Sequence, residues 1–325
     1  KKTSLLLYLA FSFCGSISFA QQALTPEVLQ TLKESYSHDD AHKAIRNAVN
    51  ANSIKKLTAN SEQAATPDTW FSHKVKSSGI SDQKSSGRCW LFTGTNVIRA
   101  QVMARFYDQL EKSNLFLQGI IDTRKKPIDD KMVEWLFRNP LSDGGQFTGV
   151  SDLIEKYGLV PKEVMAETYS SDNTNEFSAL LKRKLREDGM LLREASEKGA
   201  SEKELEQQKI DMMKTVYRML VYAYGEPPTS FTWAPKINGK YTEKPKTYTP
   251  QSFYKEVCGG EDLNANYVML MNDPSRPFNQ VYEIDYDRHT YDGHNWLYIN
   301  LPIEDIKEMA IASLKDSTMM YFSCD

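Results

Sequence analysis

The sequence is sparing in the residues that define several special classes of protein. Its 325 residues include only four cysteines, spread along the chain, so no disulfide framework is expected. With 16 glycines and 13 prolines, it is neither collagen-like nor of low complexity. Neither sign of charge dominates, because 40 basic residues face 43 acidic ones, and this balance argues against a dedicated nucleic-acid-binding protein. What is present is a chain with 40% hydrophobic residues that is long enough to bury a large core.

Long hydrophobic runs are scarce as well, and the clearest one lies at the start of the chain. Lys1 and Lys2 precede an apolar run over residues 5–19, which is shorter than the roughly 20 residues needed to span a bilayer. The run ends in small residues that suit signal peptidase. The pattern predicts a signal peptide over residues 1–20 and a secreted or periplasmic protein without membrane attachment after cleavage. A retained membrane anchor is the alternative.

The cysteine count and the two ends of the sequence add two expectations. Cleavage removes Cys14 and leaves an odd number of cysteines, so at least one thiol stays unpaired within the chain. No initiator methionine precedes Lys1, and residues 319–325 have the apolar content of a buried strand that stops without a turn. We therefore expect the sequence to be a fragment.

The pattern along the chain predicts an N-terminal arm followed by one compact domain. Residues 21–69 are polar and form the arm, with a helix starting at Pro26. Residues 70–325 form the domain, and a helix begins in it at Cys89. The residues that recur at helical spacing along this helix, and that we expect to be buried, are Leu91, Thr95, Ile98, Val102 and Phe106.

Further helices and then strands are predicted along the domain. One helix starts at Pro127, has Asp130 in its first turn and stops at Asn139. Another ends at Gly158. Residues 175–224 predict a solvent-exposed helical hairpin, and a capping box opens its second helix.

Strand-like segments occupy residues 229–233, 267–271 and 281–286, and a last helix follows from Ile303. Helices lead and strands follow, which favours the α+β class.

The segment over residues 83–90 carries the main chemical signal. Cys89 lies at the predicted start of a helix, where unpaired N–H groups and the positive end of the helix dipole stabilise a thiolate. The same N–H groups, with the Gln83 side-chain amide as a second donor, are placed to stabilise the oxyanion formed by attack on a carbonyl. Gly87 allows close approach of a substrate, and Trp90 packs behind the nucleophile. The alternative is that Cys89 is an inert thiol buried in the core.

Four motifs in this chain resemble the bleomycin hydrolase and aminopeptidase C family of papain-like cysteine peptidases. The first is Gln-Lys-Ser-Ser-Gly-Arg-Cys-Trp-Leu-Phe at residues 83–92. The others are Asp-Gly-Gly-Gln-Phe with Glu-Lys-Tyr-Gly-Leu-Val-Pro at 143–147 and 155–161, Gly-Glu-Pro-Pro with Phe-Thr-Trp at 225–228 and 231–233, and Thr-Pro, Phe-Tyr and Asn-Asp-Pro at 249–250, 253–254 and 272–274. The match runs over residues 70–325.

The resemblance implies a fold, an activity and a set of site residues. The fold is the papain-like α+β fold with a helical-hairpin insertion at about residues 175–224 and an incomplete β-rich lobe. The activity is removal of N-terminal residues from peptides through a thioester acyl-enzyme. Cys89 is the nucleophile, Gln83 is the oxyanion-hole amide, and Gly144 and Gly145 form a wall that pairs with the substrate backbone. The family implies a ring-shaped homo-hexamer, with no cofactor or metal.

Two departures from the family lead to an alternative function. The family's catalytic histidine and asparagine lie later in its sequence than any stretch matched here, and none of the chain's histidines has that setting; these are His38, His42, His73, His289 and His294. As given, the chain is expected to be close to inactive, because no imidazole assists the thiol. The family's aromatic stretch is also absent after Phe106, either deleted or unrecorded, and a different packing beside Cys89 is expected. The alternative is an inactive member that serves as a peptide-binding or assembly module.

No catalytic or binding role is assigned to the other polar clusters in the sequence. His38 and His42 are four residues apart and could bind zinc, but no third ligand accompanies them, so a surface helix is favoured. The acidic and histidine residues over 285–294 predict a polar turn between strands. The basic residues 124–126 are flanked by aspartates and are interpreted as solvated rather than as a nucleic-acid site.

Overall fold

The computed structural model describes residues 25–58, 70–75, 82–89, 91, 101–237, 240–318 and 320–322. The chain divides into two compact units, Lys1–Phe71 and Ser72–Asp325. The signal peptide predicted over residues 1–20 lies outside the described residues. Among the helices of the described ranges, none combines the length and the apolar character needed to cross a membrane.

The first unit contains three described helices. They are α1 (Pro26–Glu34), α2 (Asp40–Ala51) and α3 (Ile54–Leu57). Thr25 caps α1 by accepting the N–H of Val28, and Pro26 occupies the first turn, where its missing N–H costs nothing. The predicted helix start is therefore confirmed. His42 lies in α2, and its ring contacts Asp39, the residue that caps this helix.

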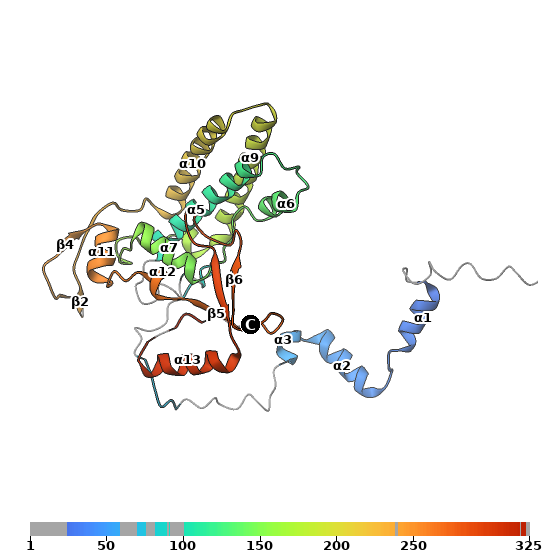
Figure 1. Ribbon diagram of the computed structural model, residues 1–325. Helices are drawn as coiled ribbons and strands as arrows, with labels where there is room; N and C mark the ends of the chain where they lie inside the picture. Colours follow the sequence, from blue (N-terminus) through green and yellow to red (C-terminus); the bar gives the residue numbers. More distant parts are fainter. Residues whose placement is uncertain are drawn as a thin grey trace, which may run out of the picture. The chain divides into compact units, whose positions relative to one another are not determined.

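The second unit is built around one long helix, α5 (Gln101–Asp122), as Figure 1 shows. Helices packed against it are α6 (Lys131–Arg138), α7 (Phe147–Tyr157), α9 (Thr174–Glu197) and α10 (Glu202–Tyr224). The described members of the predicted apolar stripe, Leu91, Val102 and Phe106, are all buried. Thr95 and Ile98 lie outside the described residues.

Helix α5 runs without interruption through the position where the family's aromatic stretch is missing. Arg105 and Phe106 are both fully buried in it, and Phe106 packs edge-on against Tyr107 and Tyr217. The helix is therefore continuous at this position, and both residues lie in the core.

Two expectations about helices need correction. Helix α6 begins at Lys131 rather than near Pro127, because the Asp130 side chain accepts the N–H groups of Met132 and Val133 and so caps the helix from outside. The prediction that the hairpin α9–α10 is solvated is wrong for one of its faces. That face contributes six leucine and valine side chains to the core: Leu181, Leu185, Leu192, Leu205, Val216 and Leu220. The predicted capping box at Ser201 is present.

Short strands follow the helices. β1 (Phe231–Trp233) pairs with β4 (Lys246–Tyr248), and β2 (Lys236–Ile237) pairs with β3 (Lys240–Tyr241), both antiparallel. A three-stranded sheet has the order β5-β7-β6, in which β5 (Met269–Met271) is parallel and β6 (Gln280–Ile284) antiparallel to β7 (Trp296–Asn300).

Small helices complete the unit, namely α8 (Tyr169–Asp172), α11 (Pro250–Val257), α12 (Leu263–Asn266) and α13 (Ile303–Lys315). The large helices up to α10 precede the strands, and α11 to α13 lie between or after them, which agrees with the predicted α+β class. The strand predicted at the end of the chain is not formed by residues 320–322, and its other residues are largely outside the described ranges.

Candidate functional site

The segment before Cys89 is fixed against a distant part of the chain. Ser85 forms a parallel β-bridge with Asn173, and the Gly87 N–H donates to Thr174 Oγ1 at 3.3 Å. Cys89 follows as a helical residue with an exposed side chain. The Cys89 thiol is therefore not buried in the core, as the alternative required.

Arg88, next to the nucleophile, is buried and ion-paired. Its guanidinium is fully inaccessible to solvent, and Nη1 lies 2.9 Å from a carboxylate oxygen of Glu167. Nη2 lies 3.5 Å from Asp172, and Nε donates to Ser86 Oγ at 2.9 Å. These contacts attach the nucleophile segment to the 167–172 region. Sequence reasoning missed Arg88, since its partners are more than seventy positions away and no local pattern indicates them.

The nucleophile segment and the glycine segment lie against each other. A Cβ added to Gly87 would be 2.8 Å from the Cβ of Asp143, a distance that only glycine permits at this approach. Gly144, next along the chain, is exposed, and Gly145 is partly exposed. The structure thus brings Gly87 beside Asp143, the residue that precedes the predicted substrate wall.

The other predicted site residues are placed in part. Gln83 is half-buried, and its side-chain oxygen has no hydrogen-bond partner within the described residues. Trp90 lies outside the described residues. Tyr321 is a further neighbour of the nucleophile that the sequence did not indicate. Burial, together with the nearby Cys89 and Tyr298, raises the pKa of Tyr321 to about 12.

A buried ionic cluster supports the glycine segment from the side of α5. Arg105 Nη2 lies 2.5 Å from Asp143 Oδ1, and Arg105 Nη1 lies 3.4 Å from Asp108. Asp108 in turn lies 2.9 Å from Lys112 Nζ and 2.8 Å from His289 Nδ1. Although burial alone would raise it, the pKa of Asp108 is lowered to about 2 by Lys112, His289 and Arg105. Asp108 therefore stays ionised and holds the cluster together.

His289 enters this cluster from the turn between β6 and β7. Its ring is almost fully buried and packs directly on α7, where a Cβ at Gly149 would lie 2.5 Å from the ring. The turn was predicted as polar, and it does connect two strands, but its histidine lies in the interior. Burial and the neighbouring Lys112 lower the pKa of His289, while Asp108 on α5 and Asp152 on α7 oppose this change. The imidazole is therefore neutral at pH 7.

This arrangement predicts an acid-sensitive stability. An unfolded histidine has a pKa of about 6.5. Because the folded pKa of His289 is lower, the unfolded state binds the proton first as the pH falls below that value. The free energy of unfolding should then decrease by at most about 1.4 kcal/mol per pH unit through this group. Urea unfolding of the parent and of His289→Asn, at pH 7 and pH 5, measures the difference. The variant should lose less stability between the two pH values.

His294 provides a control with the opposite sign. The hydrogen bond that the His294 ring donates to Asp152 raises the pKa of His294, so His294 contributes stability that is present at low pH and lost as the pH rises. His294→Asn should make the acid loss slightly steeper. Equal pH dependence of the parent and His289→Asn would contradict the assignment.

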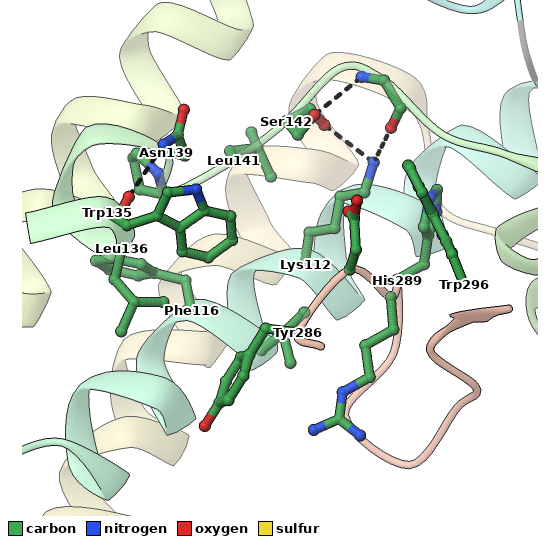
Figure 2. A pocket seen from close by; sticks show the side chains of 15 residues that line it. Lys112, Phe116, Trp135, Leu136, Asn139, Leu141, Ser142, Tyr286, His289 and Trp296 are labelled. Carbon is green, nitrogen blue, oxygen red and sulfur yellow. Dashed lines mark hydrogen bonds between the residues drawn. The ribbon is translucent and has the colours of Figure 1, made fainter. Parts of the chain in front are cut away.

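A cavity of about 180 Å³ lies beside the glycine segment. Figure 2 shows Trp135, Phe116 and Tyr286 on one side of it and Lys112, Ser142 and Trp296 on the other. In the part of the chain that the structure describes, no three histidine, cysteine or acidic side chains are grouped as metal ligands would be.

The comparisons with known proteins decide the family. Residues 23–325 match the model described as the Peptidase C1-like family. The chain belongs to this family. It is 32% identical over 321 residues to "Aminopeptidase C" of Lactobacillus delbrueckii subsp. lactis, covering 92% of this chain and 70% of that protein. It is 34% identical over 276 residues to human "Bleomycin hydrolase", covering 78% of this chain and 60% of that protein.

A solved structure agrees with these relatives. The crystal structure of PepW from Lactobacillus rhamnosis HN001 matches with a TM-score of 0.80 and 33% identity, covering 92% of this chain and 70% of that one. The predicted relation to the bleomycin hydrolase and aminopeptidase C family and the papain-like α+β fold are thereby confirmed.

Proposed function

We propose that this chain is a cysteine aminopeptidase of the bleomycin hydrolase type. The observation that carries the proposal is the exposed Cys89 at the start of a helical turn, with Gly87 of the same segment against Asp143, the residue that precedes Gly144 and Gly145. The names of the relatives, aminopeptidases and bleomycin hydrolases, support the class of reaction. The substrates are peptides with an accessible N-terminal residue.

The mechanism follows from the chemistry of the thiol. The Cys89 thiolate attacks the scissile carbonyl carbon, and the developing oxyanion accepts hydrogen bonds from helix N–H groups and the Gln83 amide. The C–N bond then breaks, the amine leaves with a proton, and a thioester remains. Water hydrolyses the thioester and restores the thiol. By resemblance, a histidine and its asparagine partner transfer the protons, and His289, buried against Asp108, is not placed for that role.

Export and assembly are part of the same proposal. The pattern of residues 1–20 supports a signal peptide and a secreted or periplasmic location. The family resemblance supports a homo-hexamer. Residues 21–69 would then form an arm and residues 70–325 the peptidase domain.

A second candidate is a catalytically inactive peptide-binding or assembly module. The histidines favour this candidate, because none of those in the described residues lies in the sequence context that the family uses for its catalytic base. Labelling of the full-length protein with the peptidyl epoxide E-64 separates the two. An activated Cys89 should label within minutes. Cys258 is the internal control, because burial raises its pKa to about 11 and keeps it protonated. Absence of labelling at Cys89, with peptide binding retained, would favour the inactive module.

A further inference from the structure

Lys112 connects the buried ionic cluster to the glycine segment. It lies on α5 with only 7% of its surface exposed. Its ammonium donates to two backbone carbonyls of the exposed segment, Ser142 O at 3.0 Å and Gly144 O at 2.8 Å (Figure 2). Asp108 lies 2.9 Å from the same nitrogen and supplies the counter-charge. One buried cation therefore holds two alternate carbonyls of this segment.

The contact of Lys112 with the Gly144 carbonyl also fixes the direction of the Gly145 N–H. The carbonyl of Gly144 and the N–H of Gly145 belong to one peptide unit, and in a trans unit they point in opposite directions. The described residues contain no cis peptide bond. Because Lys112 draws the Gly144 carbonyl inward, the Gly145 N–H points away from α5.

The backbone N–H groups of Gly144 and Gly145 differ in whether they already donate a hydrogen bond. The Gly144 N–H donates to Ser142 Oγ at 3.1 Å. The Gly145 N–H donates to no group in the described part of the protein. A partly exposed segment with an unused N–H is a suitable donor for the backbone carbonyl of an extended peptide.

We propose that Lys112 is a positioning residue, which fixes the Ser142–Gly145 segment so that the Gly145 N–H binds a backbone carbonyl of the substrate. This role rests on the proposed peptidase function. In this role Lys112 acts on the substrate through the two carbonyls rather than by direct contact with the reacting atoms. The ligand chemistry is that of an extended peptide, and any reagent that lacks a peptide backbone should be indifferent to Lys112.

The test compares two reagents that react with the same sulfur. E-64 carries a peptide-like backbone, whereas iodoacetamide is too small to reach the glycine segment. The ratio of the two second-order rate constants at Cys89 is measured in the full-length protein and in Lys112→Met. Loss of one oriented hydrogen bond should lower this ratio about tenfold. The rate with iodoacetamide should stay unchanged.

Arg193 offers a matched control. It is also a buried cation that donates to two backbone carbonyls, Thr123 O at 3.4 Å and Lys126 O at 2.6 Å, but those carbonyls lie outside the glycine segment. Arg193→Met should reduce thermal stability and leave the reagent ratio at the parent value. A merely structural role of Lys112 would give the same behaviour as Arg193.

The remaining outcomes are distinguishable. If Lys112→Met does not fold, the double variant Asp108→Asn, Lys112→Met replaces it, because that pair leaves no buried carboxylate without its cation. Lys112→Arg should restore the ratio in part, since a guanidinium also donates to two carbonyls. A parent-like ratio in the Lys112→Met or double variant overturns the positioning role alone. A parent protein whose Cys89 reacts slowly with E-64 overturns the proposed function and the positioning role together.

Discussion

Cys89→Ala in the full-length protein should abolish hydrolysis of aminoacyl amides, with a loss of at least about a thousandfold in kcat/KM. The thiolate is the only protein group in the proposed mechanism that forms a bond to the substrate, and alanine offers no nucleophile. Because the Cys89 side chain is exposed, its removal creates no cavity in the core. The unfolding temperature should therefore match that of the parent. Fluorogenic aminoacyl substrates and a thermal unfolding scan measure both quantities.

Cys258→Ala is the matched control for this experiment. Cys258 is half-buried at the end of α11, and burial raises its pKa to about 11, so it is a poor nucleophile at neutral pH. Its replacement should leave hydrolysis unchanged. Parent-like hydrolysis by Cys89→Ala would show that another group attacks the carbonyl, and the proposed mechanism would be wrong.

Much of the helical structure could be predicted because its signals are local. Ser201 and Glu204 form a reciprocal capping box, and the whole motif lies within four consecutive residues. Gly158 ends α7 with a positive φ of 71°, a conformation that glycine adopts readily. The start of α6 was misplaced because Pro127 and Asp130 are both good start signals, and only the structure shows which one caps the helix.

The error on the hairpin has a different origin. Its sequence is rich in both charges, and this pattern is typical of a solvated surface. The leucines and valines between the charges form a stripe that faces α5 and the core, as Leu185 and Leu220 show by their complete burial. The high average polarity of the hairpin sequence therefore hides the narrow apolar face that is buried.

The candidate site was predicted only where its residues are close in sequence. Cys89 at a helix start and the neighbouring glycines could be recognised from motifs. The groups that hold them could not, because their partners are remote: Arg88 and Glu167 are 79 positions apart, and Lys112 reaches carbonyls 30 and 32 positions away. His289 was assigned to a polar turn, since nothing in its neighbourhood indicates that Gly149 leaves room for its ring.

Arg88→Leu should have the second largest effect, on stability and on activity at once. The substitution leaves Glu167 and Asp172 without the buried guanidinium that lies 2.9 Å and 3.5 Å from them. Loss of one partner of a buried ion pair costs about 3–5 kcal/mol, and the lower end applies here because both carboxylates keep some contact with water. The segment that carries Cys89 loses its attachment to the 167–172 region, so kcat/KM should fall by more than the folded fraction accounts for.

Two further variants decide whether the loss of stability and activity in Arg88→Leu comes from the ion pairs of Arg88. Arg88→Lys keeps the charge but loses the fork of donors that reaches Ser86 and both carboxylates, so it should recover only part of the stability. Arg138→Leu removes an exposed arginine whose partner Glu134 is on the same helix, and it should leave the urea midpoint unchanged. Urea unfolding and hydrolysis rates, corrected for the folded fraction, give both readouts. If Arg88→Leu is as stable and as active as Arg138→Leu, the nucleophile segment is held by its backbone contacts to Asn173 and Thr174 rather than by Arg88.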